Sequence, residues 1–124
     1  MLARRPEDVD ALFFDAMNRA DLETCVALHE PDARWYMDAG RTARGRAEIG
    51  EALKQFLAFR PRFSFRVKAL PDEEGATAML VSDWEMAGTD ADGKPVRMAA
   101  RSTEVVRRQA DGTWLYAIVF GGSD

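Results

Sequence analysis

Four consecutive segments in the second half of the chain have the composition and length of β-strands, and they limit the fold more than any other feature. They span residues 62–70, 76–88, 95–108 and 113–120. The turns between them read DEEG, DADG and ADG, each with a glycine where a positive φ is wanted. Turns this short join neighbouring antiparallel strands, so we predict an antiparallel meander.

The first half of the chain predicts three helices. They begin near Pro6, Asp21 and Arg46, and each continues as a run of apolar residues at helical spacing. Pro31 ends the second helix, and residues 33–38 predict a short strand before the third helix. No linker or repeat is visible in the 124 residues, so we predict a single α+β domain, residues 1–124.

Composition argues against several classes of function. The net charge of −4 disfavours nucleic acid as a partner, and no apolar run approaches the roughly 20 residues of a membrane span. With one cysteine and one histidine, Cys25 and His29, we expect no internal disulfide, no zinc site and a cytoplasmic location. These two residues are four positions apart on a predicted helix, but Cys25 follows its apolar periodicity. We therefore expect Cys25 in the core rather than as a nucleophile.

Glu104 is the residue of the predicted sheet that is most informative about function, because its side chain lies either in a pocket or in solvent. Alternation along the sequence RSTEVV places Ser102, Glu104 and Val106 on one face. If the DADG and ADG turns are type I turns with a glycine bulge, Glu104 lies opposite Leu80 and Ile118. A carboxyl group on this face would lie in an apolar pocket, because the face also holds Trp84, Met86, Met98, Tyr116 and Phe120.

The alignment predicted from the DEEG turn conflicts with a buried Glu104. The same rule pairs Asp72 with Ala76, which puts Lys68 on the Glu104 face and Phe63 on the wetter face. A loop of another length or a bulge would remove this conflict. The pattern therefore leaves two alternatives open, a buried pocket acid or a surface carboxylate near Lys68.

The order of the elements, with the segments NRADLETCVALHEPDARWYMDAG and STEVVRRQADGTWLYAI, resembles the nuclear transport factor 2-like superfamily. Ketosteroid isomerases and polyketide cyclases belong to it, and the resemblance covers nearly the whole chain. It implies a cone-shaped half-barrel in which three N-terminal helices pack on a curved, mainly antiparallel sheet around a pocket. It implies no cofactor. Family habit also implies a homodimer through the outer sheet face, with the charged residues Asp83, Glu85, Arg101 and Arg107 at the contact.

The resemblance carries over only part of the isomerase site. Glu104 falls where ketosteroid isomerases keep a pocket acid protonated by an apolar environment. Phe13 stands at the position of their oxyanion tyrosine and Met37 at that of their general base, so we do not expect steroid isomerisation. Asp38, one residue along, is a second catalytic candidate if the strand shifts by one. The obvious candidates for the arginine–carboxylate pair of the epoxide hydrolases are Arg101 and Asp83, but they face the wetter side.

We therefore predict a protein that binds a small apolar or carbonyl-bearing molecule, with acid–base chemistry at Glu104 as its enzymatic form. A non-catalytic binding or oligomerisation module is the alternative. The predicted catalytic residues are Glu104 and Asp38, no metal ligand is expected, and the predicted pocket residues are Phe13, Met17, Trp35, Met37, Phe56, Trp84, Ser102, Ile118 and Phe120.

Overall fold

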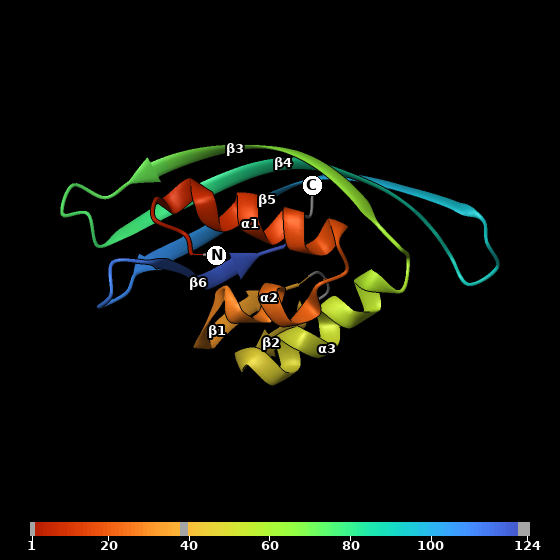
Figure 1. Cartoon of the computed structure of the whole chain (residues 1–124), viewed down its shortest axis with the longest axis horizontal. Helices are drawn as coiled ribbons and strands as arrows, with labels where there is room; N and C mark the ends of the chain where they lie inside the picture. The colour runs from red at the N-terminus through yellow and green to blue at the C-terminus, as the bar shows by residue number, and fades with distance from the viewer. Residues whose placement is uncertain (1, 38–39, 122–124) are drawn as a thin grey trace.

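A curved sheet of six strands forms the frame of the molecule, and three helices lie on its concave side (Figure 1). The computed structural model describes residues 2–37 and 40–121. The helices are α1 (Pro6–Asn18), α2 (Leu22–Ala27) and α3 (Gly45–Leu57), and the strands are β1 (His29–Tyr36), β2 (Thr42–Arg44), β3 (Arg62–Pro71), β4 (Thr77–Thr89), β5 (Pro95–Arg108) and β6 (Trp114–Phe120).

The strands lie side by side in the order β2-β1-β6-β5-β4-β3. The last four form the predicted antiparallel meander, and β1 joins it in parallel to β6. The expected α+β class is confirmed. The helices, however, do not all precede the sheet, because β1 and β2 lie between α2 and α3.

The strand predicted at residues 33–38 begins earlier than expected. β1 starts at His29, directly after the end of α2, and it contains Pro31. Proline has no N–H to give to a sheet, and it lies where the pairing of β1 with β6 shifts between His29 and Arg34. The helix therefore ends before the proline, and β1 accommodates Pro31 at the point where its pairing with β6 is irregular.

The conflict at the DEEG turn disappears because its loop is longer than the turn rule assumed. The backbone N–H of Asp72 donates to the carbonyl of Thr77, at 2.9 Å, instead of pairing Asp72 with Ala76. Leu80 then lies opposite Ala69 on β3 and opposite Glu104 on β5. This one-residue shift puts the phenylalanines of β3 on the Glu104 face and Lys68 on the other.

The predicted pairing of β6 with β5 was wrong over the last residues of β6. It holds as far as Tyr116, but a bulge follows, so that Val119 rather than Ile118 lies opposite Glu104. The extra residue reverses which side chains face inward. Ile118 and Phe120 therefore lie on the outer face, 38% and 58% exposed, and are not on the Glu104 face.

The helices are fixed to the sheet by backbone contacts at the ends of α1 and α3. The Asn18 side chain accepts from the N–H of Phe63 and donates to its carbonyl, at 2.6 and 3.1 Å. After α3, the carbonyl of Phe59 accepts from Thr89 N–H at 2.7 Å. Gly88 permits this approach, since a Cβ there would lie 2.5 Å from the same oxygen.

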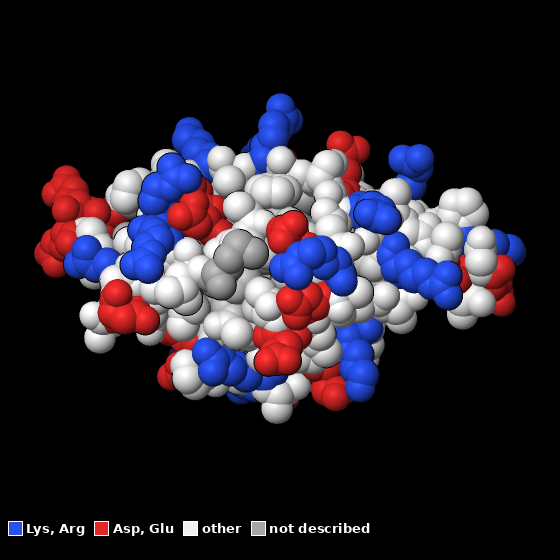
Figure 2. All heavy atoms as spheres, viewed as in Figure 1, with Lys and Arg blue, Asp and Glu red and all other residues white. Residues whose placement is uncertain are grey.

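The buried side chains form two clusters beneath the helices. One surrounds Leu80 and Val106 on the sheet, and the other surrounds Ile49 and Leu53 of α3, with Cys25 in its interior. On the face in Figure 2, basic and acidic groups are interspersed. Among the described helices, none combines the length and apolarity that crossing a membrane would require.

Candidate functional site

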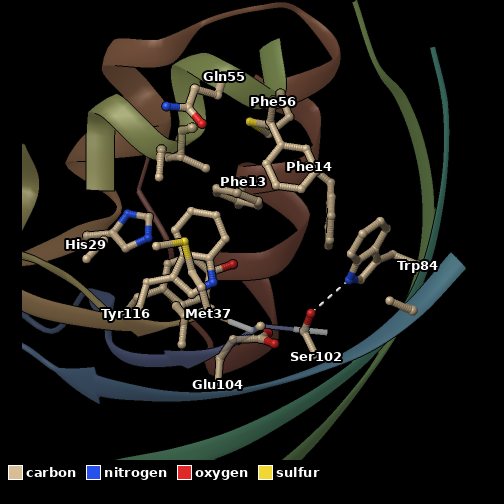
Figure 3. Close-up of a pocket in the computed structure, with 18 of the residues that line it drawn as sticks. Phe13, Phe14, His29, Met37, Gln55, Phe56, Trp84, Ser102, Glu104 and Tyr116 are labelled. Carbon is tan, nitrogen blue, oxygen red and sulfur yellow. Dashed lines mark hydrogen bonds between the residues drawn. The ribbon is translucent and has the colours of Figure 1, made fainter. Parts of the chain in front are cut away.

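A cavity of about 840 Å³ lies between the helices and the concave face of the sheet (Figure 3). Its walls are mostly apolar and come from α1 and α3 on one side and from β4 and β5 on the other. A volume of this size accommodates a drug-sized organic molecule. The cavity therefore has the dimensions of a ligand site.

The structure places most of the predicted site residues along this cavity. Ile118 and Phe120 are exceptions, because the bulge in β6 turns them to the outer face. Asp38 lies outside the described residues. The residues that line the cavity include Phe13, Met17, Trp35, Met37, Phe56, Trp84, Ser102 and Glu104.

Glu104 is buried at the base of the cavity, 3% exposed. Neither of its carboxyl oxygens has a hydrogen-bond donor among the described residues. Burial, followed by the neighbouring charge of Asp10, raises the pKa of Glu104 to about 10. The surface alternative beside Lys68 is excluded, since Lys68 lies opposite Val81 on the outer face. Glu104 is therefore a neutral carboxylic acid near pH 7.

Asp10 is the second acid of the site, and the sequence analysis missed it. It lies on α1, 1% exposed, as a neighbour of Glu104. The hydroxyl of Tyr116 donates to one of its oxygens. A signal was present, because Asp10, Phe14 and Met17 follow helical spacing and share the buried face of α1.

The two acids have different protonation states. Burial raises the pKa of Asp10, while the hydrogen bond from Tyr116 and the neighbouring Glu104 oppose this rise. Donation by Tyr116 favours the negative charge on Asp10, and Glu104 then keeps the proton. The pair thus combines one proton donor with one carboxylate inside an apolar cavity.

His29 lies beside this pair and is buried. Its ring centre is 4.8 Å from that of Tyr116, and Nδ1 lies 2.8 Å from the carbonyl oxygen of Cys25. Because a carbonyl can only accept, Nδ1 carries the proton and Nε2 is left as an acceptor. Burial lowers the pKa of His29 to about 4, so the ring is neutral near pH 7.

The wall opposite His29 is held by aromatic contacts and one hydrogen bond. Trp84 Nε1 donates to Ser102 Oγ at 2.8 Å, across two neighbouring strands. The ring of Phe63 meets that of Trp84 edge-on at 5.5 Å, and Phe14 stacks on Phe65 at 4.7 Å. These contacts fix the shape of the wall before any ligand binds.

Two other chemistries have no support at this site. Burial raises the pKa of Cys25 to about 12, so its thiol is not a nucleophile at neutral pH. Within residues 2–37 and 40–121, no three His, Cys, Asp or Glu side chains are grouped to hold a metal ion. The buried acids that line the base of the cavity are Glu104 and Asp10.

Comparison with known families gives one match. The sequence model of the SnoaL-like domain matches residues 11–117 of this chain. A comparison with curated proteins gave no match.

Several solved structures are similar to this one. A ketosteroid isomerase-like protein from Erwinia carotovora atroseptica has a TM-score of 0.81 at 22% identity, covering 93% of this chain and 90% of the other. A conserved protein from Planctomyces limnophilus also has a TM-score of 0.81, at 17% identity, with the same coverage. An uncharacterised protein with a cystatin-like fold from Caulobacter vibrioides has a TM-score of 0.76 at 22% identity, covering 92% and 83%. At these identities the similarity shows the fold alone.

Proposed function

The chain belongs to the SnoaL-like domain family of the nuclear transport factor 2-like superfamily, and from this premise we propose that it binds a small, largely apolar molecule in its cavity. One observation supports this most directly. The buried acid Glu104 lies at the base of an apolar cavity of about 840 Å³. An apolar pocket with a few polar groups at one end binds the body of a ligand by its shape and orients it by the polar end.

Glu104 is the proposed point of polar contact. As a neutral acid it can donate a hydrogen bond, so a ligand that carries a carbonyl group suits it. The enzymatic form of the proposal uses Glu104 as the acid or base of an isomerase, cyclase or hydrolase that needs no cofactor. Steroid isomerisation is not part of the proposal, because Phe13 and Met37 stand where its tyrosine and base would be.

A ligand pair that differs only in the carbonyl group tests this proposal. We expect 2-tetralone to bind more tightly than tetralin, as measured by quenching of tryptophan fluorescence. Glu104→Leu keeps the volume of the side chain and removes the hydrogen-bond donor. It should therefore lower the affinity for 2-tetralone by about three- to tenfold, the net contribution of one hydrogen bond.

The same substitution should leave the binding of tetralin unchanged. Glu73→Leu, in an exposed turn, is the matched control and should change neither affinity. If neither compound binds at high micromolar concentration, the cavity is not a site for ligands of this kind. Equal affinities for the two compounds would remove the role of Glu104.

The alternative is a binding or oligomerisation module without catalysis. The outer face of the sheet supports oligomerisation. Leu70, Met79, Ile118 and Phe120 on this face are exposed. Leu70, Met79, Val105 and Ile118 lie opposite one another in one row across four strands, and Phe120 lies beside this row. We call the four exposed residues, Leu70, Met79, Ile118 and Phe120, the outer apolar band. A band of this kind suits the face of a second copy.

Three of the four charged residues predicted for the dimer contact, Asp83, Arg101 and Arg107, already have partners within the chain. Arg101 binds Asp83 through two hydrogen bonds of 2.7 and 3.1 Å, and Arg107 binds Glu30 at 3.0 Å. We therefore place the proposed homodimer contact on the outer apolar band, with these pairs at its rim. A cytoplasmic location, suggested by the single cysteine, remains part of the proposal.

We expect the protein to be a dimer in light scattering at high micromolar concentration, and Phe120→Glu to make it a monomer. A glutamate at this position would lose its hydration in the contact and weaken it. Leu2→Glu changes a similarly exposed apolar residue outside the sheet and should leave the dimer intact. A monomeric unsubstituted protein would contradict this contact.

A further inference from the structure

Four buried oxygens that have no hydrogen-bond partner among the described residues gather at the base of the cavity. They are Asp10 Oδ2, Ser82 Oγ and both carboxyl oxygens of Glu104. We infer that they bind the ammonium group of a small apolar amine. The inference rests on the proposed ligand cavity and adds a ligand class to the carbonyl compounds considered above.

The acceptors match an ammonium group in number and place. The three residues come from α1, β4 and β5, and all line the same cavity. Figure 3 shows the Glu104 carboxyl group at the base of the cavity, between Tyr116 and Ser102. A primary ammonium group carries three N–H donors, and three of these oxygens can accept them: Asp10 Oδ2, Ser82 Oγ and the unprotonated oxygen of Glu104. A ligand that brings donors therefore satisfies oxygens that a hydrocarbon would leave without partners.

The charge of the pair also lacks a counterion. Among the described residues, no arginine or lysine forms an ion pair with Asp10 or Glu104. The other titratable groups beside the pair are Tyr116, which donates a neutral hydroxyl, and His29, whose ring is neutral near pH 7. An uncompensated buried carboxylate is costly. A bound monocation would neutralise the single negative charge of Asp10.

The walls suit a cation as well as an apolar ring system. Phe13, Phe14 and Trp84 line the cavity, with the Phe13 ring centre 5.7 Å from that of Tyr116, and aromatic faces attract ammonium groups. Among the described residues, the lining also includes Glu48 and Glu51 of α3 and one arginine, Arg41. The lining as a whole is therefore acidic, which favours the entry of cations over anions.

Three ligands of one shape test the inference by isothermal titration calorimetry at pH 7.5. They are 2-aminotetralin, which is protonated at this pH, 2-tetralone and tetralin. We expect 2-aminotetralin to bind at least about tenfold more tightly than tetralin, since a desolvated ion pair and hydrogen bonds replace unpartnered oxygens. The double substitution Asp10→Asn with Glu104→Gln should remove this advantage and leave the affinity for tetralin unchanged.

The double substitution Glu73→Gln with Glu74→Gln is the control, because it removes two carboxyl groups from an exposed turn. It should retain the preference for the amine. An amine that binds no better than tetralin, or equally well to the Asp10→Asn/Glu104→Gln protein, would overturn the inference. If 2-tetralone binds and the amine does not, the ligand cavity stands and only the amine is excluded. If none of the three binds, the proposed function fails as well.

Discussion

Replacing Glu104 with glutamine should raise the free energy of unfolding by about 1–3 kcal/mol at pH 8 and change it little at pH 4.5. Glutamine keeps the shape of the side chain and cannot ionise. The stabilisation arises because the folded protein holds Glu104 in its protonated form, with a pKa raised to about 10 by burial and by Asp10.

The sign follows from proton binding. Below the pKa of the unfolded chain, about 4.3, both states keep the Glu104 proton and pH has no effect through this group. Above it, the unfolded chain loses the proton while the folded protein keeps it, so rising pH favours unfolding up to the folded pKa. Glutamine removes this loss, and the difference between the two proteins should therefore grow from pH 4.5 to pH 8.

Denaturant unfolding of both proteins at the two pH values measures the effect. Glu73→Gln provides the baseline, because Glu73 lies in an exposed turn where the same substitution removes no buried group. A glutamine variant that is less stable at pH 8 than the original would show that the Glu104 carboxylate is stabilised in the fold. This result would contradict the pocket acid.

Leu80→Ala should destabilise the protein by about 3–5 kcal/mol, and Leu53→Ala by about 2–3 kcal/mol. Both leucines are buried and lose the same atoms. Leu80 lies in a closed cluster against Val106, so its removal leaves a void that its neighbours only partly fill. Leu53 lines the ligand cavity, so the space it leaves joins a cavity that already exists.

Chemical denaturation of the two variants under one condition checks the order of the effects. Leu53→Ala should also lower the affinity for tetralin, because it removes part of the cavity wall. Leu80→Ala should leave the affinity of the folded protein for tetralin nearly unchanged. A larger loss for Leu53→Ala would show that the cavity closes around that side chain in solution.

Local chemistry accounts for the parts of the fold that were predicted well. The DADG turn pairs Asp90 with Lys94 and so sets the alignment of β4 with β5, including Leu80 opposite Glu104. Helix periodicity likewise predicted α1 and α3. Each signal arises within a few residues, where turn geometry and side-chain spacing act directly.

The predictions were wrong where a single inserted residue decides which face of the sheet a side chain lies on. The longer loop before Thr77 moved the aromatic residues of β3 onto the Glu104 face, and the bulge after Tyr116 moved Ile118 and Phe120 off it. Strand side chains alternate, so each shift reverses a whole segment. No turn residue marks the bulge, since it lies inside an apolar strand.

The sequence alone determined the class of fold, the central strands and one candidate acid. Only the tertiary structure decided that Glu104 shares the cavity with Asp10, and that Tyr116 donates to Asp10 from 106 positions away in the chain. The physical reason is that a charge state depends on burial and on neighbours in space, which helix and sheet packing create. A local pattern can identify the acid, but the second acid beside it comes from another layer of the fold.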